Sequence, residues 1–281
     1  MKFNPIRRVT KWQAIVAVVC FATGVASSHE MWIQGSKSIV EPGTEVSLNL
    51  YVGTKFKGDD KPYNPSAFQH YRVATSTATV PITGHYGDIP AGRVKAVSPG
   101  LNIVSYHSQP FQIQFKEADK WQRYLEYEGL DEVAQHYRQN GFPQSGLRET
   151  YQRCARALIW GVPPSATSLA KADQQDRPSN MPLELISLDN PFTIASDMLK
   201  LQLLYLADPI ANIQVRVFYR AAGQKDRVVE KIARTDQHGT VTLPRFGPGD
   251  YLFNAVHLVP PPPGHQAEWQ SYWASLTFTL E

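Results

Sequence analysis

Cysteine is nearly absent from this chain of 281 residues, which has only Cys20 and Cys154. Cys20 lies in an N-terminal segment that we expect to be removed, so Cys154 would then be alone. An intrachain disulfide is therefore excluded, and the fold must be stabilised by burial of apolar side chains.

An excess of one charge is also absent. The chain has 28 basic and 25 acidic residues, and four of the basic ones (Lys2, Arg7, Arg8 and Lys11) precede the first acidic residue. Without the first 28 residues, 24 basic residues face 25 acidic ones, a formal charge of −1. This balance gives no indication of a nucleic-acid partner or of an anionic membrane surface.

Motifs of the common enzyme classes are missing. The sequence has no nucleophile elbow, P-loop or dinucleotide-binding fingerprint. It also lacks H-E-x-x-H and C-x-x-C, so no local motif predicts a metal site. We predict no catalytic residues, and the sequence favours a binding protein over an enzyme.

A long hydrophobic run is missing as well. The apolar run at residues 14–26 is shorter than the roughly 20 residues that span a bilayer. It follows the basic residues and ends in Ala26-Ser27-Ser28, which places small side chains at positions −3 and −1 of a cleavage site. We predict a signal peptide over residues 1–28, a mature N-terminus at His29, periplasmic localisation and no membrane insertion after cleavage.

The rest of the chain is predicted to be mainly β. Val46, Leu48, Leu50 and Val52 alternate with other residues, as expected of a half-buried strand. The same alternation recurs over residues 199–205, 213–219 and 251–257, and residues 275–280 read as a closing strand. We predict an N-terminal β-sandwich over residues 29–116 and an immunoglobulin-like β-sandwich over residues 191–281.

The middle of the chain has a helical pattern. Residues 117–139 are charged with spaced apolar residues, and Gly129 is a weak point in this predicted helix. Leu147, Tyr151, Cys154 and Leu158 then follow the spacing of one helix face. We predict a helical insertion over residues 117–162 and a linker or loop over residues 163–190. Arg148, Glu149, Gln152, Arg153 and Arg156 lie on the polar side of the second helix. Glu149 and Arg153 are expected to form a surface ion pair. Arg148 and Arg156 either bind a carboxylate or anchor the helix to a sandwich, and we expect anchoring.

His29 is the first candidate metal ligand. A processed N-terminal histidine offers its α-amine and its ring Nδ1 to one ion, and a second histidine would complete a three-nitrogen set suited to copper or nickel. The alternative is that His29 simply follows the cleavage site and is frayed and solvated.

Three other histidines are candidate partners. His257 ends the apolar strand of residues 251–257, and His107 ends another strand, so each is either a ligand or a hydrogen-bonded residue at a rim. His85 lies in a turn beside Gly84. The aromatic segment Trp269–Trp273 is expected to fill the core, with a sugar-stacking platform as the alternative.

Several segments together resemble a known family. They are His29-Glu30-Met31-Trp32-Ile33, Arg148-Glu149-x-Tyr151-x-Arg153, Thr235-Asp236-x-x-Gly239 and Trp269-x-Ser271-x-Trp273-Ala274-Ser275. These motifs are similar to those of domain of unknown function family 4198, bacterial periplasmic proteins often labelled NikM-like nickel-uptake components. The resemblance spans essentially the whole mature chain.

This resemblance implies a periplasmic protein that captures a divalent transition metal (nickel, cobalt or copper) for uptake or homeostasis, with a membrane metal transporter as the expected partner. It makes His29 and His257 the leading ligand candidates, with His107 and His85 as further ones. Two alternatives stay open: an interaction module that binds a partner protein or a glycan, and a copper-dependent oxidase.

Overall fold

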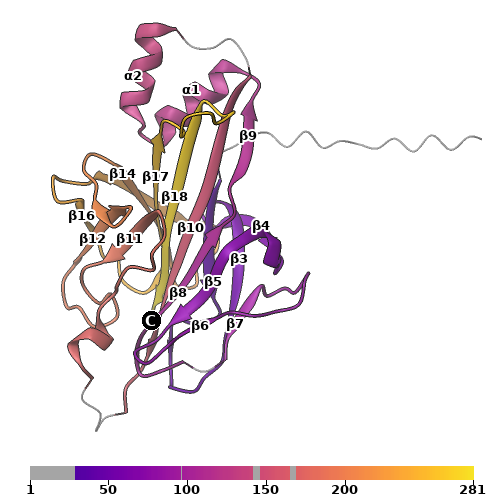
Figure 1. Cartoon of the computed structure of the whole chain (residues 1–281). Coiled ribbons are helices and arrows are strands. Elements are labelled where there is room, and N and C mark those ends of the chain that lie inside the picture. Colours follow the sequence, from indigo (N-terminus) through magenta and orange to yellow (C-terminus); the bar gives the residue numbers. More distant parts are fainter. Residues whose placement is uncertain (1–28, 96, 142–145, 165–168) are drawn as a thin grey trace, which may run out of the picture.

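The computed structural model describes residues 29–95, 97–141, 146–164 and 169–281. The predicted signal peptide, and Cys20 with it, lies outside these residues. Within them the chain forms three β-sheets and two α-helices (Figure 1), which confirms the mainly β fold.

A ten-stranded central sheet runs through the whole molecule. Its main path has the order β15-β14-β17-β18-β10-β8-β5-β6, and β2 and β9 also pair with β10. Along the chain these strands are β2 Ile39–Val40, β5 Phe68–Ala74, β6 Thr79–Pro81, β8 Gly100–Ser108, β9 Phe111–Phe115, β10 Leu147–Gly161, β14 Gln214–Ala221, β15 Val228–Arg234, β17 Gly249–Val259 and β18 Trp269–Leu280.

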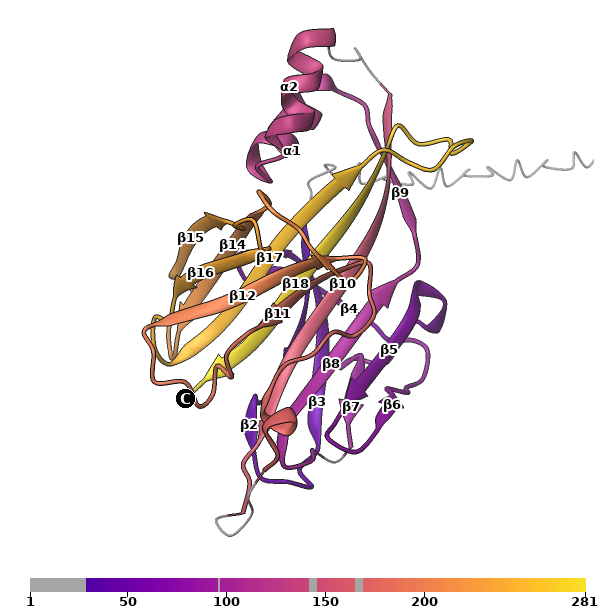
Figure 2. The ribbon, with the colours of Figure 1, turned by 60° about the vertical axis from the view of Figure 1, so that its left-hand side comes forward.

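A smaller sheet covers each face of the central sheet (Figure 2). The N-terminal sheet consists of β1 Glu30–Gly35, β3 Val46–Thr54, β4 Lys57–Lys61 and β7 Gly92–Val94. The C-terminal sheet consists of β11 Leu183–Ser187, β12 Met198–Tyr205, β13 Asp208–Pro209 and β16 Thr240–Pro244. The two predicted sandwiches therefore share one sheet.

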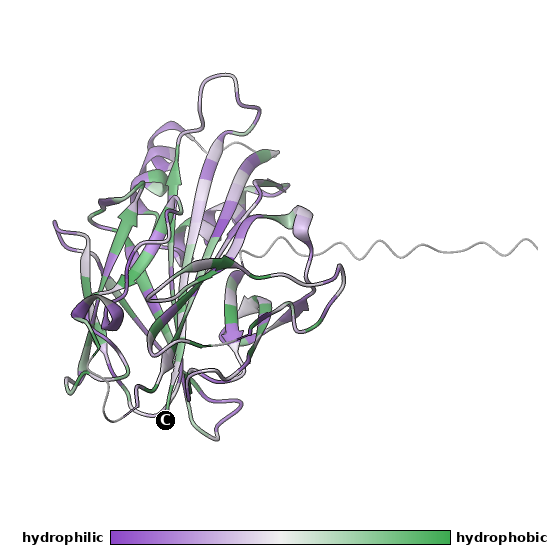
Figure 3. Ribbon diagram, turned by 60° about the horizontal axis from the view of Figure 1, so that its bottom comes forward, coloured by the Kyte–Doolittle hydropathy of each residue, from purple (hydrophilic) through white to green (hydrophobic). Residues whose placement is uncertain are grey.

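The apolar core is divided between the two interfaces. Alternate residues of β10 face opposite sides: Ala155 and Ala157 pack under the N-terminal sheet, and Leu158 and Trp160 pack under the C-terminal sheet. Apolar residues concentrate on the strands that face one another between the layers (Figure 3). Burial on both faces explains why β8 and β10 lack an alternating polar pattern.

The helical insertion is shorter than we expected. Helices α1 (Ala118–Tyr127) and α2 (Asp131–Asn140) are separated at Gly129, which has a φ of +66°. The helix predicted from Leu147 to Leu158 is wrong, because this segment is the central strand β10. The stretch expected to be a linker contains the 3₁₀ helix η2 (Lys171–Gln174) and strand β11; a second 3₁₀ helix, η1 (Pro65–Ala67), precedes β5.

The helical hairpin α1–α2 packs over one end of the central sheet. Its apolar side buries Trp121, Tyr124 and Leu125 against Phe115 of β9 and Trp273 of β18. The ring of Tyr124 stacks on the Trp273 ring with centroids 5.8 Å apart. The segment Trp269–Trp273 is thus part of strand β18, with Tyr272 and Trp273 buried in the core.

Candidate ligand pocket

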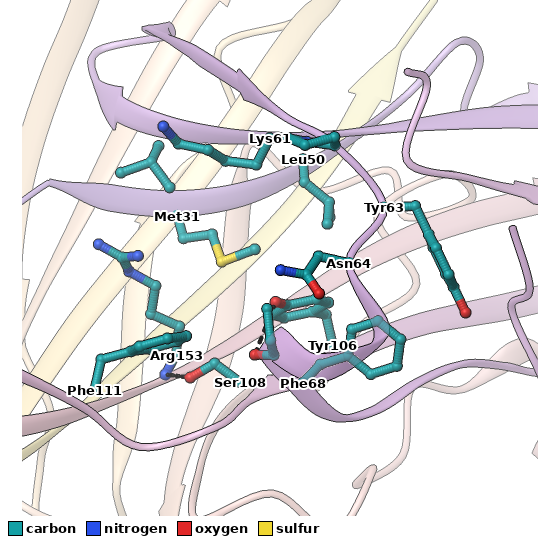
Figure 4. Close-up of a pocket in the computed structure, with 13 residues that line it drawn as sticks. Met31, Leu50, Lys61, Tyr63, Asn64, Phe68, Tyr106, Ser108, Phe111 and Arg153 are labelled. Atoms are coloured by element: carbon teal, nitrogen blue, oxygen red, sulfur yellow. Dashed lines mark hydrogen bonds between the residues drawn. The ribbon is translucent and has the colours of Figure 1, made fainter. Parts of the chain in front are cut away.

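A pocket of about 330 Å³ opens between the N-terminal sheet and the central sheet (Figure 4). Its volume lies at the small end of the range of natural ligand sites. Most of its walls are apolar, and its polar side chains come from three separate segments of the chain. The lining residues are Met31, Leu50, Val52, Lys61, Pro62, Tyr63, Asn64, Ala67, Phe68, Tyr106, Ser108, Phe111 and Arg153.

Arg153 of β10 supplies a guanidinium to this pocket. The backbone N–H of Arg153 donates to Ser108 Oγ at 2.9 Å, which fixes the residue against β8. Its side chain lies 5.0 Å from the centre of the Tyr151 ring, and burial lowers the pKa of Arg153. Among the described residues, no carboxylate forms an ion pair with Arg153, and its Nε has no hydrogen-bond partner.

This unpaired charge distinguishes the pocket from a packing defect. The Arg153 side chain is partly buried, and burial of its Nε without a hydrogen-bond partner is costly, because the lost solvation of that atom is not replaced. Lys61 of β4 lies on the same side of the pocket (Figure 4). The site, which we call the Arg153 pocket, therefore combines an apolar body with positive charge at one side.

His29 lies beside this positive side. Burial is the main cause that lowers the pKa of His29, and the charges of Arg153 and Lys61 lower it further, against the opposing effect of Asp59. The Nδ1 atom of His29 is buried and has no hydrogen-bond partner within the described chain. The imidazole is therefore neutral at neutral pH and has a free ring nitrogen.

The structure does not bring His257 to His29. His257 follows Ala255 and Phe253 on the face of β17 that packs under the C-terminal sheet, and its ring centroid lies 4.6 Å from that of Tyr205. His29 precedes β1, which packs on the other face. Burial lowers the pKa of His257, with Glu132 acting in the opposite direction.

The other two candidate histidines are also separate. His107 of β8 is buried and is three strands from His257, a distance of about 14 Å at normal strand spacing. Its ring contacts that of His70, with centroids 5.6 Å apart, and its Nε2 lies 3.2 Å from Gln152 Nε2. His85 is in an exposed turn, where its Nδ1 lies 3.4 Å from an oxygen of Asp88.

No group of three or more His, Cys, Asp or Glu side chains in the described chain has the arrangement of a metal site. Two features of the structure were not predicted from the sequence. Arg153 lines a pocket and does not lie on the surface of a helix, and His70 is the neighbour of His107. No local pattern marks either residue, because both depend on which strands become neighbours.

No helix in the described residues is long and apolar enough to cross a membrane. A comparison with curated proteins found no match. Two solved structures have weak similarity. One is a tetra-tandem repeat in the extending region of a large adhesion protein, with 12% identity over 90% of this chain and a TM-score of 0.22. The other is the D0–D1 domain of Intimin, with 12% identity over 89% of this chain and 97% of that one and a TM-score of 0.21.

This chain spans about half (49%) of the adhesion repeat structure. At such TM-scores neither similarity supports a conclusion about this protein. The family comparison is of a different kind, because it matches most of the chain. The model described as a domain of unknown function (DUF4198) matches residues 26–259, and the chain belongs to this family.

Proposed function

We propose that this protein is an exported binding protein that captures a small organic anion in the Arg153 pocket. The observation that carries this proposal is the unpaired guanidinium of Arg153 at the wall of a pocket that is otherwise mostly apolar. A carboxylate would provide the counter-charge that the described chain does not supply.

The chemistry of the lining defines the ligand class. A guanidinium binds a carboxylate through two parallel N–H···O hydrogen bonds, and Lys61 adds a second positive charge nearby. Met31, Leu50 and Phe68 would contact the hydrocarbon part of the ligand. The volume of about 330 Å³ favours a compact acid over a long chain or an oligosaccharide.

Calorimetric titration with benzoate and hexanoate tests this proposal, with benzamide and hexanamide as neutral analogues. We expect the acids to bind at least about tenfold more tightly than the amides, because only the acids pair with the partly buried charge of Arg153. Arg153→Gln should remove this preference. Arg123→Gln, which changes an exposed arginine of α1 (65% exposed), should keep it.

Equal binding of acids and amides would contradict the proposal. Unchanged preference for the acids in Arg153→Gln would contradict it as well.

A second candidate function is capture of a divalent transition metal at processed His29. The observation that favours it is the buried Nδ1 of His29, which has no partner and belongs to a neutral imidazole. Cleavage before His29 would add the α-amine as a second donor, and a membrane metal transporter would then be the partner. The nickel label of similar proteins agrees with this function, but the nearby charges of Arg153 and Lys61 oppose binding of a cation, so we rank it second.

Titration of Ni²⁺, Co²⁺ and Cu²⁺ into two forms of the protein tests this function. We expect tight binding by protein that begins at His29 and at least about tenfold weaker binding when one residue precedes His29, because the chelating amine is then lost. His257→Ala should leave binding unchanged, since His257 lies on the other face of the central sheet. The same affinity in both forms would rule out the N-terminal site.

A further inference from the structure

The turn between α1 and α2 is fastened to strands β14 and β15. The carbonyl of Tyr127 accepts hydrogen bonds from the side chains of Gln214, at 2.9 Å, and Arg216. The carbonyl of Gly129 accepts one from Arg234 Nη2 at 2.9 Å. A Cβ atom at Gly129 would lie 2.5 Å from Gln214 Oε1, so the turn packs closely on the sheet.

Glu128 lies beneath this turn, and its side chain is buried. The residue is 3% exposed, and its Oε1 has no hydrogen-bond partner among the described residues. The carboxyl thus sits in the joint between the helical hairpin and the central sheet. An ionised carboxylate there would lack the hydrogen bonds that normally compensate for burial.

Other unsatisfied polar groups share this buried compartment. Trp32 of β1 packs on Phe218 of β14 and Leu252 of β17, which form a cross-strand pair. Glu30 precedes Trp32 by two residues on the same face of β1. It therefore lies over the next cross-strand pair, which consists of Arg216 and Asn254. Glu30 is fully buried, and neither of its carboxylate oxygens has a well-aligned hydrogen bond within the described chain. The Nδ2 of Asn254, which is 2% exposed, also lacks a partner there.

Glu149 of β10 adds a further buried carboxyl. Its Oε1 accepts hydrogen bonds from Tyr124 Oη, at 3.4 Å, and Ser271 Oγ, whereas its Oε2 has none in the described chain. Acidic groups thus outnumber basic ones around Glu128. The titratable and charged groups that face it are Glu30 of β1, Tyr124 and Tyr127 of α1, Glu149 of β10, Arg216 of β14 and Glu230 of β15.

We propose that the helical hairpin α1–α2 is a proton-controlled clamp, which stays docked on the central sheet while Glu128 is protonated and is released when Glu128 ionises. Release would expose the apolar surface under the hairpin, which includes Phe115 and Trp273. This proposal is independent of the Arg153 pocket.

The direction of the pH effect follows from the buried carboxyl. Burial, and then the charges of Glu30, Glu149 and Glu230, raise the pKa of Glu128 from 4.5 to about 8, and only Arg216 opposes them. A carboxyl whose pKa is raised in the docked state stabilises that state fully when the pH is below 4.5, the pKa of the free carboxyl. That contribution is lost as the pH rises to about 8.

Hydrogen exchange followed by mass spectrometry tests the clamp. Exchange of residues 118–140 in the full mature protein is compared at pH 5.5 and pH 7.5, after correction for the intrinsic pH dependence of exchange. We expect the protection of the hairpin to fall at least roughly tenfold per pH unit, as required for loss of one or more protons on opening. Protection of β8 should change much less.

Two variants sharpen the test. Glu128→Gln mimics the protonated carboxyl and should make the pH response of hairpin protection shallower by about tenfold per pH unit, with Glu30 and Glu149 accounting for any response that remains. Glu126→Gln, an exposed change on the same helix, should behave as wild type. Constant protection in the wild type, or the same pH response in Glu128→Gln, would overturn the proposal. If added Ca²⁺ or EDTA alters the exchange, the carboxyls bind a cation and the proton-controlled clamp is also overturned.

Discussion

Arg156 shows how a single charged residue is accommodated inside this fold. Its side chain is completely buried in β10. The guanidinium pairs with Asp176 at 2.7 Å and with Glu184 at 3.5 Å, and it donates to the carbonyl of Leu185 at 2.7 Å. The expectation that Arg156 anchors a helix to a sandwich is wrong, because Arg156 lies on strand β10 and binds the segment of residues 176–185 to it.

We predict that Arg156→Ala lowers the free energy of unfolding by about 3–5 kcal/mol, because it leaves Asp176 and Glu184 buried without a counter-charge. Arg93→Ala removes an exposed pair with Glu45 and should cost less than about 1 kcal/mol. Urea denaturation of both variants measures the difference. Similar costs for the two changes would show that the buried network contributes little.

For single residues, the sequence indicated part of the candidate site. The processing pattern singled out His29, which does lie beside the Arg153 pocket. The pairing of His29 with His257 rested on family resemblance, and the structure puts the two residues on opposite faces of one sheet. Side-chain proximity of this kind depends on sheet order, and residue spacing carries no information about it.

The secondary structure of β10 could not be predicted from its own residues. Leu147, Tyr151, Cys154 and Leu158 have helical spacing, yet in the strand the first two point to one face of the sheet and the last two to the other. A strand covered on both faces has no polar side, so its sequence lacks the alternation that identifies a strand. Tertiary burial therefore overrides the local pattern.

Elements with one polar face were predicted well. In β3, Val46, Leu48 and Leu50 are buried and alternate with partly exposed residues, as the sequence predicted. The charged segment after residue 117 is helical, and Gly129 marks the break between α1 and α2. These elements lie at the surface, where alternation with solvent-facing residues is preserved.

The whole molecule is organised around the parallel pair β10 and β18. Residues 149–157 of β10 pair with residues 269–277 of β18 in the middle of the central sheet. Each of the two outer sheets packs against one face of this central sheet. The sequence predicted two sandwiches but not their shared sheet, since pairing over more than a hundred residues leaves no local signal. The domain boundaries that we predicted stay predictions.

We predict that the mature chain unfolds in one cooperative transition, because both sandwiches lose a face if the central sheet opens. Urea curves from far-UV circular dichroism and from tryptophan fluorescence should have the same midpoint. A fragment of residues 29–162 should not fold alone, since it lacks β18. Two separate transitions, or a folded fragment, would show that the sandwiches are independent units.

The position of β18 in the chain also sets the order of events during synthesis. A chain that emerges N-terminus first contains β10 long before its neighbour β18, which begins more than a hundred residues later. Until residues 269–280 emerge, the edges of β10 and β17 that pair with β18 have no partner for their backbone hydrogen bonds. Closure of the sheet is thus a late, non-local step, and incomplete chains present open strand edges to their surroundings.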